Sequence, residues 1–309
     1  MECCIHTRVD FDKSRNLSFQ TKIRRAIRRC FISIVSNSSK DKLEKFLIEC
    51  DSPTTTVLCF HNVFSDEIAY FESLVDWLDS QFTFVSYSEA VRRIYSDEII
   101  SDHAIAISFD DGFHDNIAAA ELLNKKKISG CFFVCTDFVG QSNFESVAKL
   151  NKDLLGNPPV SFMSPDDIKY IIGLGQEIGS HTVSHSRLSM ASSEDVLVEL
   201  KESRLELEQM FGKCDHFAWP YGAISDVNMS DLRLAVELGY DSVASAVRGS
   251  HAHAGPVTNS TIENVRIEVP VFIFRQAFSP RTSKNECSYF LLKGLMECVW
   301  SSCGMSEGS

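Results

Sequence analysis

The chain has 309 residues, of which 44% are hydrophobic and 23% are charged. This length suits one sizeable domain with decorations or two small domains. The composition excludes wholesale disorder, because a large hydrophobic core can be buried. The formal net charge of −12 argues against a nucleic-acid partner bound through overall charge.

Cysteine usage and hydropathy bear on the cellular location. The chain has 11 cysteines, none of them in a CxxC pair, and many lie in apolar runs, where a free cysteine behaves as a small hydrophobic residue. The first residues lack the basic start and apolar stretch of a signal peptide. No apolar run approaches the ~20 residues of a membrane span. We therefore expect reduced cysteines and a cytoplasmic protein.

Residues 1–50 are predicted to form an extension that carries a basic amphipathic helix. Between Phe19 and Ile34, apolar residues recur at helical spacing, and basic residues fill much of the other face. Such a helix either docks its apolar stripe on the domain or lies on an anionic membrane surface. Docking is favoured because the stripe is short and bounded. A peripheral membrane contact through residues 19–34 is the alternative.

From Thr54 onward, short β-rich runs alternate with helical stretches, which predicts an α/β domain over residues 51–280. Such frequent alternation indicates a parallel sheet, and about seven strand–helix units predict a distorted (β/α) barrel. The strands are expected at Thr55–Phe60, His103–Phe109, Ser129–Cys135, Gln176–Ser180, His216–Trp219, Tyr240–Ser245 and Asn264–Val269. The helices are expected at Asp66–Ser80, Tyr87–Ser96, Phe113–Lys126, Pro165–Leu174, Ser193–Phe211 and Val227–Leu238.

Two further segments lie outside this alternation. Gly140–Ser164 contains Gly156 and two prolines, and we predict a long loop over the rim where the strands end. Residues 281–309 are predicted to form a C-terminal tail with one apolar helix, Tyr289–Trp300, packed on the body of the domain.

Two adjacent acids follow the predicted strand that ends at Phe109. The apolar run Ala104–Ile107 leads into Asp110, Asp111 and a glycine. A buried strand that releases two carboxylates at its carboxyl end suits a catalytic rim. An ordinary Asp-Gly turn with solvated acids would give the same pattern.

Two histidines, His181 and His185, follow the predicted strand Gln176–Ser180. At a spacing of four residues they fall on one face of a helical turn, so both imidazoles can point at one ion. Alone, the pair is equally compatible with surface histidines. Together with a carboxylate from another strand end, it predicts a His₂Asp site with open positions, as in a catalytic metal centre.

A third segment, Phe217–Gly222, is by itself only an aromatic turn after a strand. In the order strand–DDG, strand–HxxxH and strand–PYG, however, the three segments resemble the polysaccharide deacetylase family, which is carbohydrate esterase family four with its nodulation-type deacetylase domain. The resemblance runs from about Thr56 to Val269. It also takes in the segments CFHNV at 59–63, FMS at 162–164, EIGSH at 177–181 and GY at 239–240.

The resemblance implies the base and the metal ligands. Asp110 would be the general base, and Asp111, His181 and His185 would bind a divalent metal. The metal is expected to be zinc, with cobalt or manganese as alternatives. A metal-activated water would then attack the acetyl group while Asp110 takes the proton of that water.

The resemblance also implies groups around the acetyl carbonyl. The main-chain N–H of Tyr221 would help to form the oxyanion hole. His61, Trp219 and Pro220 would contact the substrate.

Two parts of the family pattern are missing. Many members have an arginine two residues before the motif proline that orients the base, and here that position is Ala218. Arg266 could supply the missing cation or could form a plain surface salt bridge. A late Leu-x-His segment with the general acid is also absent. His251 and His253 could close over the site and donate the proton, although a flexible loop without such a role is favoured.

These observations predict a hydrolase that removes an acetyl group, in the first place an N-acetyl group, from a carbohydrate or polysaccharide precursor. The same machinery would serve a non-glycan amide or an O-acetyl ester, because the pocket decides the substrate. A carbohydrate-binding pseudoenzyme is the third possibility, and the complete Asp/Asp/His/His set speaks against it.

Overall fold

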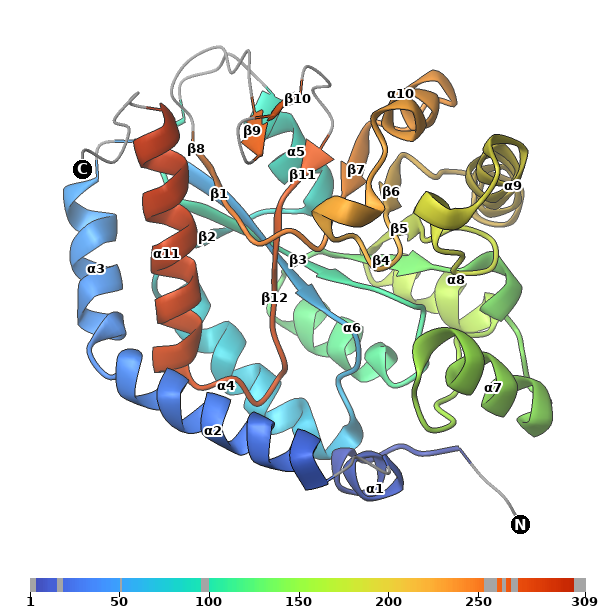
Figure 1. The fold of residues 1–309 in the computed structure, drawn as a ribbon, viewed down its shortest axis with the longest axis horizontal. Helices are drawn as coiled ribbons and strands as arrows, with labels where there is room; N and C mark the ends of the chain where they lie inside the picture. The colour runs from blue at the N-terminus through green and yellow to red at the C-terminus, as the bar shows by residue number, and fades with distance from the viewer. Residues whose placement is uncertain are drawn as a thin grey trace.

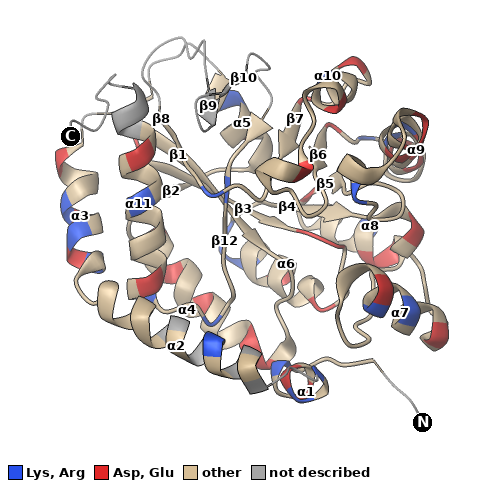
Figure 2. Ribbon diagram, in the orientation of Figure 1, with Lys and Arg blue, Asp and Glu red and all other residues tan. Residues whose placement is uncertain are grey.

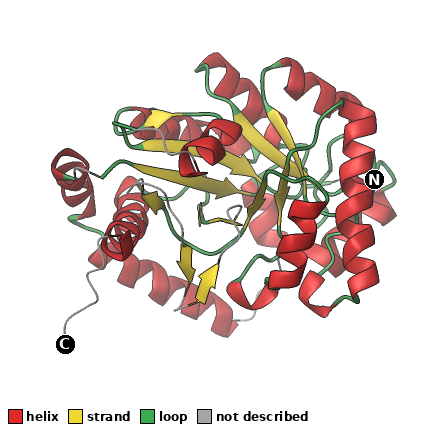
Figure 3. Ribbon diagram, turned by 90° about the horizontal axis from the view of Figure 1, so that it is seen from above, coloured by secondary structure: helices red, strands yellow, loops and turns green. Residues whose placement is uncertain are grey.

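The computed structural model describes residues 4–15, 19–50, 52–95, 100–252, 260–262, 265–267 and 272–302. Its centre is a curved, mostly parallel sheet with helices around it (Figures 1 and 3). The strands follow one another across the sheet in the order β11 (Phe272–Ile273), β7 (Ser242–Ala244), β6 (His216–Ala218), β5 (Glu177–Ser180), β4 (Gly130–Val134), β3 (Ala104–Phe109), β1 (Thr54–Phe60) and β12 (Arg275–Ala277). In addition, β2 (Thr83–Phe84) pairs with β3, and β8 (His251–Ala252) pairs antiparallel with β1.

The sheet is curled into a half-barrel, which confirms the predicted distorted (β/α) barrel. Helices lie between and around the strands as the alternation predicts. The α-helices are α1 (Arg8–Ser14), α2 (Phe19–Val35), α3 (Ser39–Glu49), α4 (Ile68–Asp79), α5 (Tyr87–Tyr95), α6 (Asn116–Lys125), α7 (Phe144–Leu150), α8 (Pro165–Gly173), α9 (Ser193–Phe211), α10 (Met229–Glu237) and α11 (Lys284–Ser302). Short 3₁₀ turns are η1 (Ser65–Glu67), η2 (Thr136–Phe138), η4 (Leu188–Met190) and η5 (Ile224–Asp226), and η3 (Asn151–Leu155) is a π-turn.

The sheet separates two apolar layers, so both faces of its central strands are buried. Every residue of β1 and β3 is buried. On the inner side, Ala106 and Phe133 pack with residues of α5, and the Tyr87 ring meets the Phe133 ring edge-on with centroids 5.3 Å apart. Because Ser88 donates to Glu177 at the start of β5, α5 closes the amino end of the barrel. The carboxyl end is left open for a site.

The last strand of the barrel is not the predicted Asn264–Val269. Within that range the structure describes Val265–Ile267 (β10), which pairs with β9 (Ser260–Ile262) in a separate two-stranded sheet. The segment 272–277 takes the place in the main sheet, pairing with β7 through β11 and with β1 through β12. It thus bridges the two ends of the curved sheet. Pieces of two and three residues are too short to show a strand period.

The predicted loop Gly140–Ser164 is also partly wrong, since it contains α7 and η3. The Asn143 side chain accepts a hydrogen bond from the Ser146 N–H and so caps α7. Val147 is buried beneath the helix. Gly156 ends the π-turn with a left-handed φ of 63°. The predicted C-terminal helix is confirmed in α11, which is longer at both ends and packs on α3.

The predicted basic amphipathic helix is α2, but its apolar stripe does not dock on the domain. Four apolar side chains of the stripe are exposed to solvent: Ile23 to 42%, Ile27 to 64%, Phe31 to 65% and Ile34 to 76%. The docking that the sequence favours is therefore wrong. Among the described residues, no helix has the length and apolarity needed to cross a bilayer.

Candidate active site

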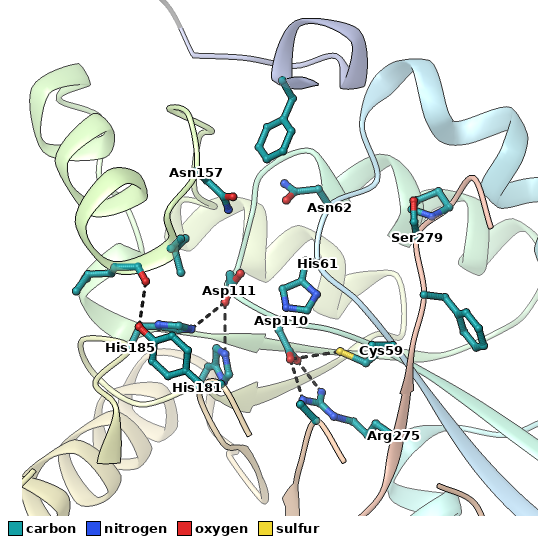
Figure 4. A pocket seen from close by; sticks show the side chains of 18 of the residues that line it. Cys59, His61, Asn62, Asp110, Asp111, Asn157, His181, His185, Arg275 and Ser279 are labelled. Carbon is teal, nitrogen blue, oxygen red and sulfur yellow. Dashed lines mark hydrogen bonds and ion pairs between the residues drawn. The ribbon is translucent and has the colours of Figure 1, made fainter. Parts of the chain in front are cut away.

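A cavity of about 370 Å³ opens where the parallel strands end (Figure 4). Its floor consists of residues at or just after the carboxyl ends of β1, β3, β5 and β6, together with the start of β12. These floor residues are Cys59, His61, Asp110, Asp111, His181, His185, Trp219, Tyr221 and Arg275.

Three buried side chains converge on one point in this cavity. The Nε2 atoms of His181 and His185 each lie 3.4 Å from Oδ1 of Asp111, and the three potential ligand atoms lie within 4.8 Å of one another. All three residues are buried, with at most 6% of their surface exposed. Residues far apart in the chain thus form one compact His₂Asp cluster.

The local backbone that brings the histidines together is a loop rather than the helical turn that the spacing suggests. Thr182 and His185 both have left-handed φ values, of 70° and 59°, so the backbone leaves the right-handed helical conformation at two of these five residues. The Thr182 hydroxyl accepts a hydrogen bond from the His185 N–H. Asp111 also has a left-handed φ, of 72°. Strain of this kind in non-glycine residues gathers at functional sites.

Neighbouring groups fix the orientation of the cluster. Nδ1 of His181 lies 2.7 Å from the Ala218 carbonyl oxygen, which can only accept, so Nδ1 donates and the lone pair of the neutral ring is on Nε2. Glu199 of α9 accepts from the main-chain N–H groups of Val183 and Ser184 at 2.8 and 2.9 Å. Such supporting contacts accompany metal-binding histidines.

The cluster fits a divalent cation. Oδ1 of Asp111 is buried and has no hydrogen-bond partner among the described residues, although the Nε2 atoms of His181 and His185 face it. A carboxylate oxygen and an imidazole lone pair repel each other unless a cation lies between them. Two imidazoles and one carboxylate form a donor set suited to zinc, cobalt or manganese.

The candidate base, Asp110, is buried beside the cluster and paired with Arg275. Nη1 and Nη2 of Arg275 contact Oδ1 and Oδ2 of Asp110 at 2.7 and 2.8 Å, a bidentate pair (Figure 4). Burial raises the pKa of the Asp110 carboxyl, but the charge and hydrogen bonds of Arg275 outweigh burial and hold that pKa at about 2. Asp110 is therefore ionised at neutral pH, as a proton acceptor must be.

Arg275 supplies the cation for which Arg266 was a candidate in the sequence. Arg266 lies on β10, in the separate hairpin, whereas Arg275 starts β12 beside β1. The Nε of Arg275 donates to the Ser245 carbonyl at 2.7 Å, and the residue is 1% exposed. The sequence contains one signal for this role. Arg275 directly follows the apolar run 271–274, and an arginine that is buried with such a run must find a partner.

Two further groups at the end of β1 face the base. The Cys59 thiol donates to Oδ2 of Asp110 at 3.3 Å, and burial raises the pKa of that thiol well above its usual value. His61 lines the cavity and interacts electrostatically with both Asp110 and Asp111. Its ring lies next to the two carboxylates in Figure 4. His61 thus lies beside the two carboxylates, and its contact with substrate stays a prediction.

Only some residues of the aromatic turn Phe217–Gly222 line the cavity. Trp219 and Tyr221 line the cavity, and Tyr221 has a left-handed φ of 62°. The guanidinium of Arg187 lies 3.9 Å from the Tyr221 ring centroid, and the phenol donates to the Leu154 carbonyl. Pro220 is buried and does not line the cavity. Its carbonyl accepts from the Gly222 N–H, so Pro220 shapes the turn, and its contact with substrate stays a prediction.

His251 does not reach the site. His251 is buried in β8, opposite Thr55 at the start of β1, whereas Asp110 lies beyond the far end of the sheet. Nε2 of His251 accepts from the Phe274 N–H at 3.0 Å. His251 therefore has a structural place at the amino end of the barrel and cannot close over the cavity. His253 lies outside the described residues.

The amino-terminal segment forms part of the cavity wall, which no motif indicated. Arg8, Phe11 and Arg15 line the cavity. Phe11 is 3% exposed, and its ring centroid lies 5.2 Å from that of Phe64. The Ile5 N–H donates to the carbonyl of Pro159 at 2.9 Å, so the segment is joined to the region around α7.

Comparison with known proteins identifies a domain within the chain. A sequence model described as polysaccharide deacetylase matches residues 98–243. Residues 98–243 thus match the polysaccharide deacetylase domain. A domain of this kind supports a hydrolase that acts on carbon–nitrogen bonds other than peptide bonds, and it implies a carbohydrate substrate.

Solved deacetylase structures share the fold. Streptococcus pyogenes deacetylase PplD in complex with acetate has a TM-score of 0.57 at 19% identity, over 79% of this chain and 98% of that chain. IcaB from Ammonifex degensii has a TM-score of 0.56 at 20% identity, over 77% and 96%. A de-N-acetylase from Aggregatibacter actinomycetemcomitans has a TM-score of 0.57 at 16% identity, over 77% and 99%. A comparison with curated proteins finds no match.

Proposed function

We propose that the protein is a metal-dependent N-deacetylase of an acetylated carbohydrate, with its active centre in this cavity. The observation that carries the proposal is the buried Asp111 oxygen, which faces two imidazole nitrogens and lies beside an ionised aspartate. A divalent cation held by Asp111, His181 and His185 would polarise the acetyl carbonyl and acidify a water molecule.

Two side chains carry out the two proton transfers, Asp110 as the acceptor and His61 as the donor. Asp110 accepts the proton of the attacking water, and Arg275 keeps its carboxylate oriented and charged. The Tyr221 N–H donates to the oxyanion that develops on the acetyl carbonyl. His61 donates a proton to the leaving amine nitrogen. The bond between the carbonyl carbon and nitrogen breaks, and acetate and a free amine are released.

His61 is assigned as the donor because of its position. It lines the cavity on the β1 side, across from the histidine pair, and it interacts with both carboxylates. Of the described histidines that line the cavity, the other two face Asp111 with their Nε2 atoms.

The experiment is a measurement of acetate release from acetylated mono- and oligosaccharides, with zinc, cobalt or manganese added. We expect release from N-acetylated sugars, abolished by a chelator and restored by metal. Metal content is measured independently by elemental analysis, and His181→Ala should lose the metal.

The outcomes separate the alternatives. Release only from O-acetylated sugars would make the protein an esterase. Binding of acetylated glycans without release, in protein that contains metal, would identify a carbohydrate-binding pseudoenzyme. Activity that persists in metal-free protein would contradict the proposed mechanism.

A further inference from the structure

The helix α2 lies on the outside of the molecule (Figure 1), and four of its apolar side chains are exposed. We call Ile23, Ile27, Phe31 and Ile34 the α2 ridge. Their spacing of four, four and three residues places them on one face of the helix, and they are exposed to between 42% and 76%. A contiguous apolar surface of this kind marks an interaction site on a soluble protein.

The charge of the surrounding segment is opposite to that of the whole chain. Residues 13–40 contain eight lysines and arginines and no aspartate or glutamate, whereas the chain has a formal net charge of −12. The sequence of α2 contains no aspartate or glutamate, and Figure 2 marks the charged residues that the structure describes. Five basic residues, Lys22, Arg24, Arg25, Arg28 and Arg29, occur in the sequence between positions 22 and 29, and Arg24 directly follows Ile23 of the α2 ridge. The partner should therefore be both apolar and anionic.

We propose that the α2 ridge binds the surface of an anionic lipid bilayer. An amphipathic helix of this type inserts its apolar face at the boundary between headgroups and acyl chains, while flanking cations contact the anionic headgroups. Lysine and arginine suit such a helix because their long stems reach from the apolar level to the headgroups.

A second copy of the chain fits this surface less well. In a symmetric dimer the same patch faces itself, so two α2 helices would bring their cations together with no acidic residue in the segment to pair them. The body of the protein leaves the α2 ridge exposed as well, since the helix contacts α11 without burying the four side chains.

The test is co-sedimentation of the full chain with vesicles of phosphatidylcholine, with or without phosphatidylglycerol. We expect binding only to the anionic vesicles, weakening as salt shortens the screening length. Arg24→Gln with Arg28→Gln should lower the partition coefficient about 25-fold, because each cation near the surface contributes about five-fold. Ile27→Glu with Phe31→Glu should lower it by at least about ten-fold.

Ile48→Glu is the matched control. Ile48 lies on α3 and is 84% exposed, so this variant makes the same kind of substitution away from the ridge and should bind as the wild type does. Circular dichroism verifies the fold of each variant. If a ridge variant fails to fold, the dependence of wild-type binding on lipid charge and salt still tests the proposal.

Three results would overturn the proposal. They are absence of binding to anionic vesicles, equal binding to neutral vesicles, and a dimer in solution that Ile27→Glu with Phe31→Glu dissociates while vesicle binding is unchanged. None of these measurements uses acetate release, so the inference stands or fails independently of the proposed function.

Discussion

At the residue scale, the bidentate pair between Asp110 and Arg275 sets the state of the candidate base. Both residues are nearly inaccessible to solvent. A buried carboxylate without a partner would take up a proton, because burial disfavours its charged form. With Arg275 in place the carboxylate stays charged and both oxygens are held.

We predict that Arg275→Ala destabilises the fold by about 3–5 kcal/mol, since it leaves a buried charge unpaired. Arg275→Lys keeps the positive charge but cannot form the bidentate contact of a guanidinium. Its stability and kcat should therefore lie between those of the alanine variant and the wild type. Thermal unfolding and steady-state kinetics measure the two effects. A wild-type kcat in the alanine variant, with normal metal content, would show that Arg275 does not position the base.

The residues that could be predicted from the sequence are those that follow a recognisable strand. Asp110, Asp111, His181 and His185 each come directly after an apolar or β-rich run, and the structure brings all four together. Arg275 could not be assigned in this way. Its meeting with Asp110 depends on the pairing of β12 with β1, and register between distant segments has no local signature.

At the element scale, α9 supports the histidine loop through one side chain. Glu199 accepts two main-chain hydrogen bonds from Val183 and Ser184, and its other oxygen accepts from the Ser186 hydroxyl at 2.9 Å. These contacts hold the left-handed turn that aims His185 at Asp111.

We therefore predict that Glu199→Ala lowers the metal affinity about 10–100-fold, although Glu199 is not a ligand. Titration of the metal-free protein with zinc measures the change. Glu194→Ala, at an exposed position in the first turn of the same helix, is the control and should bind zinc as the wild type does. Equal affinities in the two variants would exclude this supporting role.

The element α1 forms a wall of the cavity without touching the metal cluster. We predict that Phe11→Ala raises KM for the acetylated sugar about five-fold, because an aromatic contact worth on the order of 1 kcal/mol is lost. The value of kcat should stay near wild type, since uniform binding affects only KM. Steady-state kinetics test this, and a large fall in kcat with unchanged KM would place Phe11 in the chemical step instead.

At the scale of the whole molecule, the barrel follows from the alternation of strands and helices, which the sequence shows clearly between Thr54 and Ser245. The closing segment 272–277 escaped prediction because neither of its two pieces exceeds three residues. The exposure of the α2 ridge could not be predicted from the sequence either. Amphipathic spacing shows that a face is apolar but not which surface covers it.

Metal binding should couple to the stability of the entire fold, because the ligands come from separate strand ends. With free zinc at about 100 times Kd, binding to the folded state alone adds about 2.7 kcal/mol. We predict that chelation lowers Tm of the wild type and leaves Tm of His181→Ala unchanged. A scanning calorimetry trace with and without chelator measures this, and identical wild-type traces would argue against a resident metal.

The comparison of Asp110→Asn with the wild type, at equal metal content, tests the central claim most directly. The substitution preserves size and removes the proton acceptor, whereas Asp111, His181 and His185 remain to hold the ion. We predict that acetate release from an N-acetylated sugar falls about 10²–10⁴-fold while zinc stoichiometry is unchanged. Acetate release at the wild-type rate from the zinc-loaded asparagine variant would contradict the account.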